Sequence, residues 1–335
     1  MIGKILMTFS AILIALTFSI ASQVSAITPT PAPTKTPSAE STEEPGTDSE
    51  TTDEEDTETV DAQYIEPYTQ ADLSVLTGNV QRPNAAFWHN DKLYTVCNGD
   101  WTLYELEDDT GSTITYSYGV RNGHTLYAEG ESTLDLFIPD YDVNALVQVT
   151  GGASPITIAD QLEGPWGIAY LDEENFLVTT LLGNQLLKIS RDGDVEELVT
   201  GFRSPTGVAL SDEYVFVANN GSARRSIEWL PLEELGSEST PEPLVSGLQN
   251  TTGIVYAEDG NLYFAYAVGT RGVVGRVDPE VCIEQGGCTN DQVEIVLYTE
   301  LAAPLAGLTI SPDMRLFVHT IYRPEIYWVD IDQSN

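Results

Sequence analysis

The chain has 335 residues, of which 41% are apolar and 20% charged, so it can form one large domain or two small ones around a hydrophobic core. It holds 52 Asp and Glu against 14 Lys and Arg, a formal charge of −38. The electrostatic field of this negative charge repels phosphate backbones and anionic membranes, which excludes nucleic acid as a partner. The charge is not confined to one tail, because 41 acids and 12 bases follow Ala62.

Residues 1–26 have the pattern of a signal peptide. A short basic stretch ends at Lys4, an apolar run covers Ile5–Ile20, and Val24–Ala26 is a small-x-small cleavage pattern. The run is short for a membrane span, which needs about 20 residues, so we expect no membrane insertion after cleavage. The sequence therefore predicts a secreted, extracellular protein, with an uncleaved anchor that tethers it to the cell surface as the alternative.

Residues 27–62 differ in composition from the rest of the chain. Thr and Pro dominate the first part, and acids such as Glu43, Glu44 and Asp53–Asp56 dominate the second. Apolar side chains are nearly absent, so nothing offsets the entropy of ordering this segment. We expect a disordered linker, which Pro and like-charge repulsion extend.

Residues 63–335 contain a repeated unit of short apolar strands separated by Gly or acidic turns. Four clear copies begin at a glycine within an apolar strand, at Gly167, Gly207, Gly253 and Gly307, and fainter copies lie near Gly123 and Pro83. Units of forty-odd residues with strand alternation are typical of propeller blades. The sequence predicts an all-β, six-bladed β-propeller of four-stranded antiparallel blades.

The chain ends also predict how the ring closes. The last unit reaches its third strand at Glu325–Asp330 and lacks a fourth, whereas Asp72–Gly78 resembles the fourth strands Glu196–Gly201 and Glu242–Gly247. We expect this N-terminal strand to complete the sixth blade and to remove an open edge.

Two of the three cysteines form a candidate disulfide. Cys282 and Cys288 flank a Gly-Gly turn in the longest unit, and in an exported protein this pattern favours a local disulfide. Cys97 lies in an apolar strand, where we expect a buried free thiol.

The repeated units resemble the NHL and YVTN class of propellers. Gly164–Ala169 and Ser204–Ala209 carry the Pro-x-Gly-Ile-Ala type of strand, and Glu258–Phe264 is similar to repeats of virginiamycin B lyase-like propellers. The resemblance implies a fold rather than a function, since such propellers carry many activities.

The resemblance also implies where a site would lie, around the central channel. A gluconolactonase-like site would hold a divalent cation such as calcium with Glu, Asn and Asp. Glu163 matches that pattern, but Thr206 and Asn219 stand where the family has Asn and Asp. The lyases carry a catalytic Glu and His, which Phe264–Ala267 lacks. We therefore assign no cofactor, no metal ligand and no catalytic residue.

The channel positions instead predict a ligand-binding site of neutral hydrogen-bonding groups and aromatic faces. The predicted residues are Trp166, Thr206, Asn219, Asn220, Thr252, Tyr266 and His319. We expect Trp166, Asn219 and His319 to share one pocket for a small neutral or carbohydrate-like ligand. The alternatives are that the Thr and Asn side chains only satisfy backbone groups at strand ends, and that His319 is a structural hydrogen-bonding residue.

Two classes of function remain open from the sequence. The leading interpretation is a monomeric binding or scaffold module, whose partner is a small molecule or an extracellular protein or glycan. The alternative is a hydrolase or lyase of the gluconolactonase or strictosidine-synthase-like type, which dependence on a metal ion would distinguish.

Overall fold

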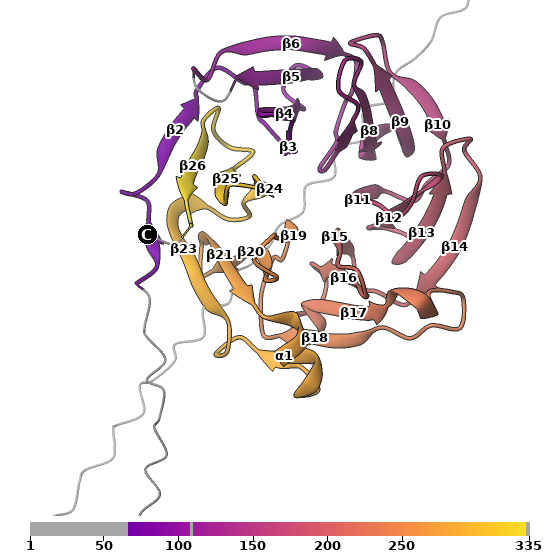
Figure 1. The fold of residues 1–335 in the computed structure, drawn as a ribbon, viewed down its shortest axis with the longest axis vertical. Helices are drawn as coiled ribbons and strands as arrows, with labels where there is room; N and C mark the ends of the chain where they lie inside the picture. The colour runs from indigo at the N-terminus through magenta and orange to yellow at the C-terminus, as the bar shows by residue number, and fades with distance from the viewer. Residues whose placement is uncertain (1–65, 108–109, 333–335) are drawn as a thin grey trace, which may run out of the picture. The chain divides into compact units, whose positions relative to one another are not determined.

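The computed structural model describes residues 66–107 and 110–332. The predicted signal peptide and linker lie outside these residues. Six small antiparallel sheets form a six-bladed β-propeller with the blades in chain order around the ring, which confirms the predicted fold class (Figure 1). None of the helices in these two ranges is long and apolar enough to cross a membrane.

The first three blades are continuous in sequence, and each adds its strands from the channel outward. Blade 1 contains β3 (Phe87–His89), β4 (Lys92–Cys97), β5 (Thr102–Glu107) and β6 (Thr113–Tyr118). Blade 2 contains β7 (Tyr127–Glu129), β8 (Asp135–Asp140), β9 (Ala145–Thr150) and β10 (Ile156–Ala159). Blade 3 contains β11 (Pro165–Tyr170), β12 (Asn175–Thr180), β13 (Gln185–Ser190) and β14 (Val195–Thr200).

The last three blades each use a strand from elsewhere in the chain. Blade 4 contains β15 (Pro205–Leu210), β16 (Tyr214–Asn219), β17 (Ile227–Pro231), β18 (Glu242–Ser246) and, at its outer edge, β22 (Cys288–Thr289). Blade 5 contains β19 (Ile254–Tyr256), β20 (Leu262–Val268), β21 (Arg271–Val277), β23 (Glu294–Ala302) and β1 (Tyr68–Thr69). Blade 6 contains β24 (Ala306–Ile310), β25 (Arg315–His319), β26 (Ile326–Asp330) and β2 (Ser74–Thr77).

Helical structure is confined to short segments in the loops. The α-helix α1 covers Pro279–Glu284, where Asp278 caps the first turn by accepting hydrogen bonds from two backbone amides. Three 3₁₀ turns complete the set in the described residues: η1 (Tyr141–Val143), η2 (Ala223–Arg225) and η3 (Leu232–Glu234).

The ring closes as the chain ends predict. Strand β2 pairs antiparallel with β26, with Ser74 opposite Trp328 and Thr77 opposite Ile326. In Figure 1 the indigo β2 lies beside the yellow β26. Strand β2 thus joins the two ends of the described chain within one blade and covers the outer edge of β26.

The insertion in the fifth unit reaches back to blade 4. Cys282 and Cys288 form the predicted disulfide, and β22 then pairs parallel with β18 through Val245 and Ser246. Cys97 is buried without a disulfide partner, also as predicted. The insertion therefore bridges two neighbouring blades.

The hydrophobic core consists of separate clusters, each between two neighbouring blades. One cluster joins Leu76 and Ile326 of blade 6 to Leu93 and Leu106 of blade 1. Because every blade depends on both neighbours for the burial of its faces, closure of the ring contributes to the stability of all six.

The glycines that mark the repeat have a steric role at the channel wall. A Cβ on Gly167 would lie 2.3 Å from the carbonyl oxygen of Thr206, and one on Gly207 would lie 2.6 Å from Cγ2 of Ile254. Each of these glycines therefore lets its innermost strand approach the innermost strand of the next blade. This close approach explains why a glycine recurs once in each of these units.

Candidate functional site

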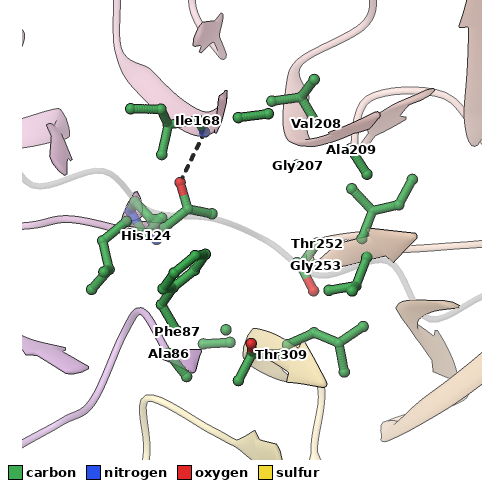
Figure 2. A pocket seen from close by; sticks show the side chains of 18 of the residues that line it. Ala86, Phe87, His124, Ile168, Gly207, Val208, Ala209, Thr252, Gly253 and Thr309 are labelled. Carbon is green, nitrogen blue, oxygen red and sulfur yellow. Dashed lines mark hydrogen bonds between the residues drawn. The ribbon is translucent and has the colours of Figure 1, made fainter. Parts of the chain in front are cut away.

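A cavity of about 410 Å³ occupies the central channel. The innermost strands of all six blades contribute to its wall, and side chains from every blade surround one central space in Figure 2. A volume of this size is in the range that accepts a small organic ligand.

One side of the cavity, from blades 1–3, is aromatic. His124 lies flat on Trp166, with ring centroids 3.3 Å apart and planes 7° apart. Further along the channel, Tyr127 stacks on Tyr170 at 5.5 Å and meets the edge of Phe87 at 5.8 Å. This wall offers flat, polarisable surfaces.

The other side, from blades 4–6, is largely aliphatic. It is formed mainly by Val208, Leu210, Ile254, Leu305, Leu308 and Ile310. The cavity therefore has one face suited to stacking against a planar group and one suited to burying saturated carbon.

The cavity wall carries no charged side chain. The residues that form it include no Asp, Glu, Lys, Arg or Cys. Burial lowers the pKa of the half-buried His124 to about 3, so its imidazole is neutral at physiological pH. Across the two described ranges, no three His, Cys, Asp or Glu side chains come together in a group that could hold a metal ion. The site favours an uncharged ligand, because a buried charge without a partner is costly.

Most polar groups of the wall already have backbone partners. Thr125 Oγ1 donates to the carbonyl oxygen of Trp166 at 2.7 Å, and Thr252 Oγ1 donates to that of Leu305 at 2.7 Å. Asn84 differs, because its Nδ2 donates to Oδ1 of Asn122 at 2.7 Å while its own buried Oδ1 has no partner. This oxygen is inaccessible to solvent, so it lies behind the surface of the cavity and is not presented to a ligand.

Two of the predicted site residues, Trp166 and Thr252, line this cavity. Thr206 is fully buried behind the wall, where its hydroxyl lies 3.1 Å from the carbonyl oxygen of Thr251 in the next blade. For Thr206 and Thr252 the structure therefore agrees with the alternative interpretation, in which Thr hydroxyls satisfy backbone groups.

Asn219 lies outside the cavity wall in a buried polar network of blade 4. Its Nδ2 donates to Glu228 at 2.8 Å, and its Oδ1 accepts from the backbone amide of Arg203 at 2.9 Å. Arg225 forms an ion pair with the same carboxylate. Burial raises the pKa of Glu228, and Arg225 and Asn219 oppose that shift. The neighbouring Asn220 is exposed in the loop that follows β16.

His319 and Tyr266 also lie outside the wall. His319 is fully buried behind Gly307, its ring nitrogens have no hydrogen-bond partner that meets normal geometry, and burial lowers its pKa to about 3. Tyr266 packs in the core between blades 4 and 5, where burial raises its pKa to about 12. The structure thus does not bring Trp166, Asn219 and His319 into one pocket.

Glu163, which resembles a metal ligand of the gluconolactonases, lies outside the cavity wall, and so does Asp140. Glu163 is exposed, and its backbone carbonyl accepts hydrogen bonds from Leu182 and Gly183. Asp140 caps η1 and accepts from the backbone amides of Arg121 and Asn122 at 2.7 Å and 3.1 Å. These contacts give Asp140 a structural role.

Sequence reasoning predicted Trp166 but missed the other residues of the aromatic wall. A usable signal was present, because the third residue after each strand glycine lines the cavity in four blades, as Tyr170, Leu210, Tyr256 and Ile310. His124 directly follows the fainter glycine, Gly123. Its partner Trp166 comes from another blade, so no local pattern links the two rings.

No protein-family model matches the chain, and no curated protein matches its sequence. Among solved structures, a virginiamycin B lyase from Staphylococcus aureus with quinupristin matches with a TM-score of 0.54 and 15% identity, over 76% of this chain and 98% of that one. A gluconolactonase from Xanthomonas campestris matches with a TM-score of 0.60 and 12% identity, over 76% and 88%.

A calcium-binding protein, regucalcin, from Agrobacterium tumefaciens matches with a TM-score of 0.59 and 14% identity, over 79% of this chain and 95% of that one. These similarities agree with the six-bladed propeller fold of this chain. At such identities they show the fold alone, and the chemistry of the site has to be argued from its own residues.

Proposed function

We propose that this protein binds a small, uncharged, mostly apolar molecule with a planar ring in its central channel. The observation that carries the proposal is the cavity itself, with an aromatic wall on one side, an aliphatic wall on the other and no charged side chain. The wall offers a ligand few hydrogen-bond partners, because the Thr125 and Thr252 hydroxyls are already bonded and Asn84 Oδ1 is buried. A strongly hydroxylated ligand would leave most of its groups unpaired, so this proposal shifts the expected ligand from sugars toward apolar rings.

The predicted export agrees with a binding role in the extracellular space. The cleavage pattern at Val24–Ala26 and the Thr/Pro linker suit a secreted protein whose propeller is held apart from a surface or a neighbouring module. The channel would then capture its ligand outside the cell.

The test uses two probes of the same shape and different charge, 2-naphthol and 2-naphthoate, titrated by calorimetry into the full chain. We expect 2-naphthol to bind at least tenfold more tightly, because the carboxylate of 2-naphthoate would lose its hydration without gaining a partner. Trp166→Ala should remove most of the affinity, while the matched change Trp101→Ala, outside the cavity wall, should not. Equal affinity for both probes, or no effect of Trp166→Ala, would reject the proposal.

A lyase or hydrolase is the second candidate, and it depends on the activities named for the structural neighbours. Within the cavity wall His124 is the one imidazole, and a bound substrate would have to raise its lowered pKa before it could act as a base. Incubation of the full chain with quinupristin and with gluconolactone, followed by mass spectrometry, tests this candidate. Turnover that His124→Ala abolishes would favour the enzyme over the binding module.

A further inference from the structure

The positive charges of the propeller separate into two groups. Of the twelve Lys and Arg residues after Lys35, six are exposed and six are partly buried. The partly buried group consists of Lys92, Lys188, Arg191, Arg225, Arg276 and Arg315, and each forms an ion pair with an acid. These six cations stabilise the fold and are not available to a partner.

The exposed group behaves differently. It consists of Arg82, Arg121, Arg203, Arg224, Arg271 and Arg323, and contains no Lys. Within the described ranges, none of the six forms an ion pair. Arg121 lies over the ring of Trp101 at 5.4 Å, and Arg203 and Arg271 donate to backbone carbonyls. In a chain with a large excess of acids, six arginines without a carboxylate partner need an explanation.

All six lie at the same end of the blades. Because neighbouring strands are antiparallel, the loops between the second and third strands lie at the same end as the loops that connect one blade to the next. Arg82, Arg121 and Arg203 lie in connections between blades. Arg224, Arg271 and Arg323 lie in, or directly after, loops between second and third strands. We call this end of the propeller the arginine face.

The same loops carry exposed apolar side chains. Trp101 is 46% exposed, Leu182 59% and Tyr322 62%, each from the loop between the second and third strands of a different blade. Val143 and Val268 are exposed in, or next to, the equivalent loops of blades 2 and 5. Arginine beside exposed Trp and Tyr is the composition that protein–protein interfaces favour, and such interfaces are depleted in Lys.

The opposite face has the reverse charge. Its loops join the first strand of a blade to the second, and the third to the fourth, and they expose acids in every blade. Examples are Asp91, Glu131, Asp172, Glu173, Asp192, Asp212, Glu258 and Asp313. The arginine face has four exposed acids, Asp142, Asp160, Glu163 and Glu300, against its six arginines. The charge of the propeller is thus polarised from one face to the other.

We propose that the arginine face is a docking surface for an acidic protein segment that also carries aromatic side chains. Six guanidinium groups around the ring can each form a bidentate pair with a carboxylate, a geometry that Lys cannot provide. Trp101 and Tyr322 offer flat surfaces to aromatic side chains of the partner. The loops of this face also contribute His124 and Ile321 to the cavity wall, but the guanidinium groups and the uncharged cavity suit different classes of molecule.

The test measures binding of the full chain, by biolayer interferometry in 150 mM salt, to three immobilised polymers: poly(Glu,Tyr) of 4:1 composition, poly-Glu and dextran sulfate. We expect binding to poly(Glu,Tyr) to be tightest. Replacing Arg82, Arg224 and Arg323 with Gln should weaken that binding at least tenfold. These three side chains have no hydrogen-bond or ion-pair partner in the described residues, so the fold should not change.

The matched control makes the same change of net charge on the opposite face, with Ser132→Asp, Ser237→Asp and Thr240→Asp, all at exposed positions. This variant should bind poly(Glu,Tyr) within twofold of the unchanged protein. An equal loss in both triple variants would show that net charge alone controls binding and would overturn the proposal. Absence of binding to both polypeptides would also overturn it, and binding to dextran sulfate alone would assign the face to an anionic glycan instead.

Discussion

Strand β2 should contribute a large part of the stability of the propeller. Leu76 at its centre and Val80 just beyond it are buried between blades 6 and 1, at 8% and 0% exposure. Each contributes about 1.5–3 kcal/mol by burial, and each hydrogen bond to β26 adds about 1 kcal/mol. Loss of the strand should therefore cost about 5 kcal/mol or more, against a total stability of about 5–15 kcal/mol for a typical domain.

Three shortened chains separate this effect from the rest of the N-terminal segment. A chain that begins at residue 66 keeps β1 and β2, one that begins at 73 lacks β1, and one that begins at 81 lacks both. Because about 1 kcal/mol shifts Tm by roughly 2–4 °C in a domain of this size, the chain from 81 should melt about 10–20 °C below the chain from 66. The chain from 73 should lose less, since β1 forms only a two-residue parallel pair with β23.

Calorimetric melting of the three chains at equal concentration is the measurement. If the chain from 81 melts within about 3 °C of the chain from 66, the sixth blade does not need β2, and our account of ring closure is refuted. Aggregation of the chain from 81 at low temperature would agree with the account, because this chain lacks β2 and the edge of β26 is therefore open.

Three further changes should act through groups buried elsewhere. His319 stays neutral in the folded state down to a pKa of about 3, whereas the unfolded chain takes up its proton below about 6.5, so stability should fall as the pH drops from 6.5. His319 and His124 should each contribute about 2 kcal/mol to the loss that urea unfolding shows between pH 7.5 and 5.0, and His319→Asn should remove the share of His319 alone. The double change Cys282→Ser and Cys288→Ser should lower the free energy of unfolding by about 2 kcal/mol and speed hydrogen exchange in β22. Unchanged exchange in β22 would contradict the view that the disulfide holds this strand on blade 4. Asn219→Ala should cost about 1–3 kcal/mol in thermal melts, because it leaves Glu228 with one hydrogen-bond partner fewer in a buried site; an unchanged Tm would count against this.

The fold could be predicted because its determinants are local and repeated. Each strand glycine marks a close contact between blades, so the steric need recurs once per unit and becomes visible as a repeat. The closing strand Asp72–Gly78 was visible for a similar reason, since it resembles the fourth strands of other blades and the last blade lacks one. The disulfide between Cys282 and Cys288 spans only six residues, so sequence proximity alone was sufficient.

The site was harder to predict because it depends on strand register. Asn219 ends the second strand of blade 4 and was predicted to face the channel. The pairing places Asn219 opposite Pro205, as Thr180 lies opposite Pro165 in blade 3. A shift of one residue along a strand moves a side chain to the other face of the sheet. Asn219 therefore points to Glu228, and no pattern in β16 alone reveals that partner.

Net charge was informative about the whole chain and misleading about its parts. A formal charge of −38 predicts repulsion of any extended polyanion, yet the field felt at contact is local, because ions screen exposed charges beyond about 8 Å at physiological ionic strength. The acids of the opposite face therefore act weakly on a partner at the arginine face, where Arg82, Arg224 and Arg323 have no competing ion pair among the described residues. A nucleic-acid strand long enough to reach the opposite face would meet its exposed acids, whereas a short acidic protein segment would meet mainly the arginines. The size of an anionic partner, and not its charge alone, should decide whether this propeller binds it.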